Sequence, residues 1–61
     1  MTNTKDALQA QKNTLMEALK ALRAIQTTAD FSDQQNAEMD EVEMDVLSAA
    51  TRLSQFISKM V

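Results

Sequence analysis

From residue 39 onward, apolar side chains recur at alternating steps of three and four residues. This spacing is typical of the a and d positions of a helix that packs along other helices. It constrains the fold more than any other feature of the chain, and it names no substrate, cofactor or nucleic-acid target. The series is Met39, Val42, Val46, Ala49, Leu53, Phe56 and Met60.

The composition favours helices that need a partner chain. The 61 residues include no Gly, Pro, Cys or His. The absence of Gly and Pro argues against β-turns and sheets. Without Cys and His, disulfides and thiolate or imidazole metal sites are excluded. A chain of about 60 residues buries only about 60% of its unfolded surface, so we expect oligomerisation to supply the remaining stability.

Two helices and a turn are predicted within a single domain over residues 1–61. The first helix is expected over about 4–27, the turn over about 28–32, and the second helix over about 33–60. The apolar series of the two segments differ in phase by three positions, which a turn between them resolves. The predicted fold is therefore all-α, a two-helix antiparallel hairpin.

Local signals mark where each helix starts. Asn3 or Thr4 offers a side-chain oxygen to the free N–H groups of the first turn. Ser32 and Gln35 have the spacing of a capping box at the start of the second helix. These signals agree with the break that the change of phase requires.

The second helix has more apolar surface than one neighbouring helix covers. Leu47, Ala50, Ile57 and Val61 flank the main series, and we expect this face to remain uncovered in a single hairpin. Two hairpins that pair through it would form a dimeric four-helix bundle. The predicted core and oligomer interface comprises Leu8, Leu15, Leu19, Leu22, Ile25, Met39, Val42, Val46, Leu47, Ala49, Ala50, Leu53, Phe56, Ile57 and Met60.

Charge is separated along the chain. Residues 30–45 contain seven acidic side chains and no basic one. An antiparallel hairpin would place this acidic segment beside Lys20 and Arg23. A dense negative field can steer a basic protein partner, as a nucleic-acid mimic would. The candidate partner-binding residues are Glu38, Glu41, Asp45, Lys20 and Arg23.

The first predicted helix is mildly basic and rich in Gln and Asn side chains. Lys5, Lys12, Lys20 and Arg23 alternate with Gln and Asn residues. In length, acidic balance, hairpin architecture and Thr-rich start, the chain resembles the plasmid-encoded Rop family, and in scale the accessory proteins of temperate phages. The resemblance implies a hairpin dimer that binds paired RNA loops through one helix face with an aromatic residue. In this sequence the aromatic residues lie outside helix 1.

Catalysis is not expected, because His, Cys, Tyr and Trp are absent and the serines have no evident base. We expect a non-enzymatic protein-protein interaction or regulatory adaptor that acts as a homo-oligomer without a cofactor or metal. The alternatives are a Rop-like RNA-binding regulator and an acidic mimic that binds a basic protein. No apolar run reaches the ~20 residues of a membrane span, and the N-terminus lacks a signal-like apolar stretch. A cytoplasmic location is therefore expected.

Overall fold

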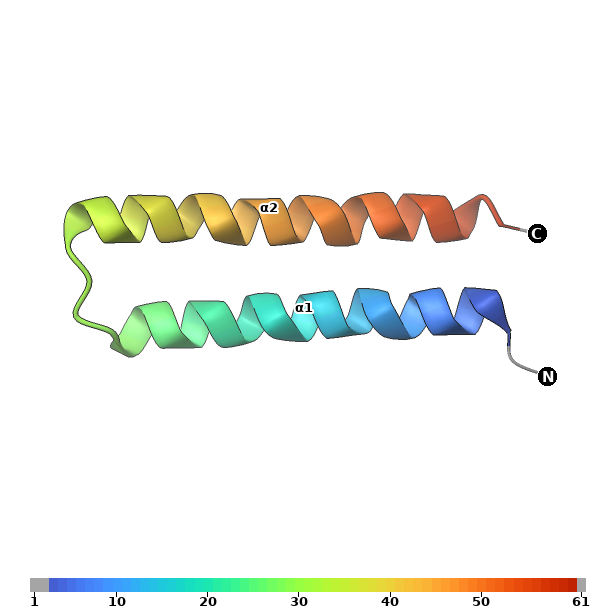
Figure 1. The fold of residues 1–61 in the computed structure, drawn as a ribbon, viewed down its shortest axis with the longest axis horizontal. Coiled ribbons are helices and arrows are strands. Elements are labelled where there is room, and N and C mark those ends of the chain that lie inside the picture. The colour runs from blue at the N-terminus through green and yellow to red at the C-terminus, as the bar shows by residue number, and fades with distance from the viewer. Residues whose placement is uncertain (1–2, 61) are drawn as a thin grey trace.

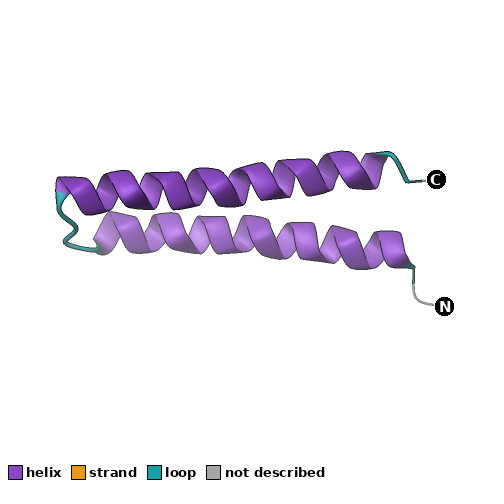
Figure 2. Cartoon of the chain, turned by 45° about the horizontal axis from the view of Figure 1, so that its top comes forward, coloured by secondary structure: helices purple, strands orange, loops and turns teal. Residues whose placement is uncertain are grey.

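The computed structural model describes residues 3–60, which form two antiparallel α-helices (Figure 1). Helix α1 spans Thr4–Thr28 and helix α2 spans Asp33–Ser58. The helices lie side by side along their length in both views (Figures 1 and 2). The predicted all-α hairpin is thus confirmed.

Each helix begins at the residue that the local sequence indicates. Asn3 Oδ1 accepts the N–H of Lys5 at 2.9 Å, so Asn3 caps α1. At α2, Ser32 Oγ accepts the N–H of Gln35 at 3.1 Å, and Gln35 Oε1 accepts the N–H of Ser32 at 2.9 Å. The predicted capping box is confirmed, and both bonds satisfy donors that a helix start leaves free.

The first helix continues one residue beyond the predicted boundary. Thr27 Oγ1 donates to the carbonyl of Arg23 at 2.8 Å, and Thr28 Oγ1 donates to that of Ala24 at 3.3 Å. These bonds keep the β-branched side chains within the helix. The chain then crosses to α2 through residues 29–32. No described residue has a positive φ, so the connection does not require glycine.

The residues that each helix turns toward the other follow alternating steps of three and four positions. Among the described residues, the buried apolar ones are Leu19, Ala50 and Ile57, and the others in this seam are half-buried, apart from the buried Glu43. The seam comprises Leu8, Lys12, Leu15, Leu19, Leu22 and Gln26 of α1, and Asn36, Met39, Glu43, Val46, Ala50, Leu53 and Ile57 of α2.

The hairpin is an elongated layer one helix thick. Its Cα atoms extend over 47 × 18 × 9 Å, with a radius of gyration of 14.5 Å. A compact domain of this length has a radius of about 10.5 Å. The layer therefore has two broad faces, one on each side of the seam (Figure 2).

One prediction about packing is wrong. The sequence suggested that the face with Leu47, Ala50, Ile57 and Val61 would stay uncovered. In the structure Ala50 and Ile57 are only 3% and 4% exposed, because α1 packs against their side of α2. Leu47 is exposed, and Val61 lies outside the described residues. Val42 and Phe56, on the other flank of α2, are uncovered as well.

Candidate protein interface

The helix–helix seam is polar near the turn. Gln26 Nε2 donates to Asp40 Oδ1 at 3.0 Å and to Asn36 Oδ1 at 3.3 Å. Arg23 Nε lies 3.9 Å from Glu43 Oε1, and Glu43 is buried. Its second oxygen, Oε2, is buried without a hydrogen-bond partner. The hairpin therefore buries the Glu43 carboxylate and half-buries the Gln26 amide at positions where apolar side chains would gain more from burial.

Beside this seam, each helix exposes a stripe of residues that is more apolar than the part of the seam near the turn. On α1 it contains Ala18 and Ile25, and on α2 it contains Val42, Ala49 and Phe56. Ile25 is 53% exposed, Val42 46% and Phe56 57%. Large apolar side chains that gather on one surface indicate an interaction site, whereas scattered ones do not. The relative position of the two stripes therefore decides whether they form one interaction surface.

Both stripes lie on the same side of the layer. Met16 of α1 and Leu47 of α2 line one groove, so they share one side of the seam. Successive helix residues rotate by about 100°, which places residues 18 and 49 on the flank opposite to residues 16 and 47. The resulting surface is called the open face. It comprises Leu8, Gln11, Leu15, Ala18, Leu22 and Ile25 of α1, and Met39, Val42, Val46, Ala49, Leu53 and Phe56 of α2.

The open face contains no charged residue, but its two edges differ in character. Along α2 the edge consists of exposed residues at seven-residue intervals, two acidic and then two basic. Along α1 the equivalent edge consists of small uncharged residues with the same spacing. The charged edge is Glu38, Asp45, Arg52 and Lys59, and the small edge is Ala7, Thr14, Ala21 and Thr28. Lys59 is the C-cap residue of α2, and Arg52 also borders a shallow hollow beside Leu47 and Thr51.

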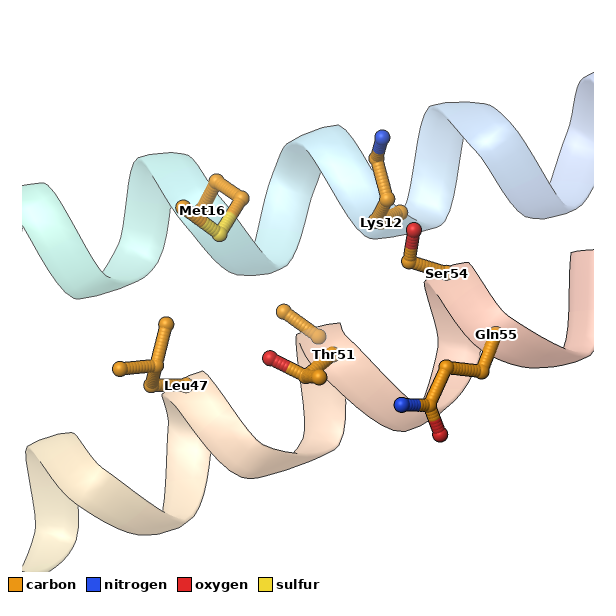
Figure 3. Close-up of a pocket in the computed structure, with 7 residues that line it drawn as sticks. Lys12, Met16, Leu47, Thr51, Ser54 and Gln55 are labelled. Atoms are coloured by element: carbon orange, nitrogen blue, oxygen red, sulfur yellow. The ribbon is translucent and has the colours of Figure 1, made fainter. Parts of the chain in front are cut away.

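The other side of the layer is hollowed by a shallow groove of about 310 Å³. Figure 3 shows Lys12 and Met16 of α1 across from Leu47, Thr51, Ser54 and Gln55 of α2. A neighbouring hollow is lined by Lys20, Arg23 and Glu17 together with Met16 and Leu19. This groove face therefore combines apolar side chains with charged ones, in contrast to the uncharged open face.

All five candidate partner-binding residues are exposed, but they do not form one patch. Glu38 and Asp45 belong to the charged edge, whereas Glu41 points outward from α2. Lys20 and Arg23 lie beside the groove face. Arg23 has the acidic neighbour Glu43, so the basic side chains of α1 do not form a surface free of acidic groups.

Sequence reasoning missed two features of these surfaces. Gln26 and Glu43 belong to the seam, although composition placed both with the polar surface. Arg52 and Lys59 were not among the candidate residues, although they continue the line of Glu38 and Asp45. The seven-residue spacing was the available signal in both cases, because it identifies side chains that share one line of a helix.

Within residues 3–60, no three acidic, His or Cys side chains converge as metal ligands would. Over the same residues, neither helix is long and apolar enough to cross a membrane.

Comparisons with family models, with curated proteins and with solved structures give no match. The likeness to the Rop family therefore extends to a two-helix all-α hairpin and no further.

Proposed function

We propose that this chain is a non-enzymatic protein-protein interaction module that works as a homodimer. Two hairpins would meet through their open faces and form a four-helix bundle. The proposal rests on which side chains the hairpin buries between its two helices. The hairpin half-buries Gln26 and buries Glu43 while it exposes Ile25, Val42 and Phe56. A lone hairpin would gain more by burying the apolar stripe, at roughly 25 cal/mol per Å² of apolar area.

The amount of exposed surface supports the same proposal. The hairpin has an accessible surface of 4918 Å². A compact monomer of this mass exposes roughly 4,000 Å². The excess of roughly 900 Å² resembles the ~800 Å² that each partner contributes to a standard protein interface. A second copy on the open face would remove about this area from water.

A dimer of this kind would act as an adaptor through its remaining surfaces. Its two groove faces would point outward and present apolar and charged side chains, including Met16, Lys20 and Leu47. Such surfaces suit protein contacts better than the uniformly basic patch that phosphate binding favours. The RNA-binding alternative is less well supported, since Glu43 neutralises part of the charge of Arg23.

Sedimentation equilibrium at micromolar concentration tests the proposal. We expect the wild-type chain to have about twice its monomer mass and a thermal stability that rises with concentration. Phe56→Asp should shift the equilibrium toward monomer, because it places a charge on the open face. Met44→Asp is the matched control, since Met44 is 67% exposed and lies away from the open face.

Two results would contradict the proposal. A wild-type monomer with concentration-independent stability would show that the open face has no second copy on it. Equal dimerisation of Phe56→Asp and Met44→Asp would place the dimer contact on another surface.

A further inference from the structure

We infer that the second copy packs with its turn at the opposite end, so that α2 lies antiparallel to α2 of the second copy and α1 to α1. This inference rests on the proposed dimer and specifies its geometry. It starts from the charged edge of the open face. Along this edge, Glu38 and Asp45 precede Arg52 and Lys59 at equal seven-residue intervals.

A two-fold axis makes this edge complementary to itself. In an isologous contact, if residue i touches residue j of the partner, then j touches i. When two copies of α2 run antiparallel, Glu38 faces Lys59 of the second copy and Asp45 faces Arg52. Both pairs arise from one register, because their residue numbers have the same midpoint. Four opposite-charge pairs would therefore flank the contact, as such residues do beside coiled-coil cores.

The apolar stripe of α2 requires nearly the same register. With the axis close to Ala49, Val42 of one copy faces Phe56 of the other, and Ala49 faces its own counterpart. The exposed side chains thus alternate large, small and large along the contact. The small side chain at the centre allows the helices to approach while the larger residues fill the space on either side.

The sequence of α1 is compatible with a two-fold axis at the same position along the hairpin. The midpoint of its small edge lies between residues 17 and 18, and Ala18 is the middle position of its stripe, between Gln11 and Ile25. Inside the hairpin, Gln26 contacts Asp40 and Arg23 contacts Glu43. Both contacts put residue 18 level with residue 48, adjacent to Ala49. One two-fold axis can therefore pass through the middle of both helices, which two independent sequence patterns need not have allowed.

The competing arrangement has both turns at the same end. It places α2 against α1 of the second copy, so the charged edge would face Ala7, Thr14, Ala21 and Thr28. The four charges would then have no opposite charge across the contact. The charge pattern consequently favours turns at opposite ends.

Single cysteines distinguish the two arrangements, because the chain has no cysteine of its own. Disulfides form only between Cα atoms within roughly 7 Å. With turns at opposite ends, Ala49→Cys and Ala18→Cys should each give a disulfide-linked dimer on mild oxidation. Met44→Cys, which is exposed away from the open face, is the control and should remain unlinked.

The outcomes separate this inference from the proposed dimer. If Ala18→Cys and Ala49→Cys cross-link only when mixed, the turns lie at the same end and the inference is wrong. A sedimenting dimer in which neither variant cross-links overturns the geometry but leaves the dimer intact. A monomer at all concentrations overturns both.

Charge reversal provides a second test on the intact chain. Glu38→Lys with Asp45→Lys makes the edge wholly basic, and Arg52→Glu with Lys59→Glu makes it wholly acidic. We expect each variant alone to dimerise about tenfold more weakly, and a mixture of the two to recover a tight heterodimer. Glu17→Lys with Glu41→Lys has the same net change as the basic variant, but both residues are exposed away from the open face. Equal weakening by this control would show that net charge, and not the edge, is responsible.

Discussion

Arg23 and Glu43 form an ion pair whose two partners have different surroundings. Arg23 Nε lies 3.9 Å from Glu43 Oε1, and the side chain of Arg23 is 61% exposed while that of Glu43 is 9% exposed. Glu43 Oε2 has no hydrogen-bond partner. A carboxylate removed from water needs close compensation, and one long contact with an exposed guanidinium supplies little.

Replacing this carboxylate by an apolar side chain should therefore stabilise the protein. We expect Glu43→Leu to raise the free energy of unfolding by about 1–3 kcal/mol, since buried ion pairs are often outperformed by apolar residues of similar size. Urea denaturation followed by circular dichroism measures the change. Glu41→Leu, on the outer surface of α2, should change stability by less than about 0.5 kcal/mol. A less stable Glu43→Leu variant would mean that the ion pair makes a net favourable contribution.

Leu53 belongs to the line of α2 that borders both the seam and the open face, and it is half-buried in the hairpin. Leu53→Asp would place an uncompensated charge there, at a cost of several kcal/mol, which is comparable with the whole stability of a small fold. Circular dichroism should show a major loss of helix. Ser48→Asp, at an exposed position, should remain helical. A helical Leu53→Asp variant of wild-type stability would show that this line is not buried.

The capping box at α2 can be measured directly. Ser32→Ala removes the acceptor for the N–H of Gln35 and should lower the free energy of unfolding by about 1 kcal/mol. Ser48→Ala tests the same change at an exposed position inside α2. Adding Gln35→Ala to Ser32→Ala should cost less than the sum of the two single changes, because both residues serve one motif. Strict additivity in thermal denaturation would contradict this coupling.

RNA binding through α1 can be tested by replacing the basic side chains beside the groove face. We expect Lys20→Gln with Arg23→Gln to leave retention of host RNA unchanged at every salt concentration. Filter binding across a salt series measures this. A loss of RNA retention in the variant would favour the RNA-binding alternative, particularly with a slope of log affinity against log salt that falls by about 0.7–0.9 per lost phosphate contact.

The hairpin and its helix starts were predictable because they depend on local signals. Asn3 and Ser32 satisfy backbone donors within the next three residues, so the sequence near each helix start contains the information. The choice between the two flanks of α2 depends instead on where α1 lies. Both flanks are apolar, one with Ala50 and Ile57 and the other with Ala49 and Phe56. Spacing within one helix does not distinguish them.

The sequence also did not predict the separate roles of the charged residues. The acidic segment was visible from composition, but the roles of its members depend on neighbours in space. Glu43 is buried in the seam, Glu38 borders the open face, and Glu41 points outward. Lines of residues seven positions apart separate these roles, whereas a count of acidic residues along the sequence does not.

The shared end of the two helices has a consequence for chain connectivity. Thr4 starts α1 at the same end at which Ser58 completes α2 (Figure 1). A short linker between these points, with a cut in the exposed connection near Asp30, would give a circular permutant in which α2 precedes α1. Domains with neighbouring ends tolerate such rearrangement, and neither face of the layer would change. The order in which the helices are synthesised is therefore separable from the surfaces that they present.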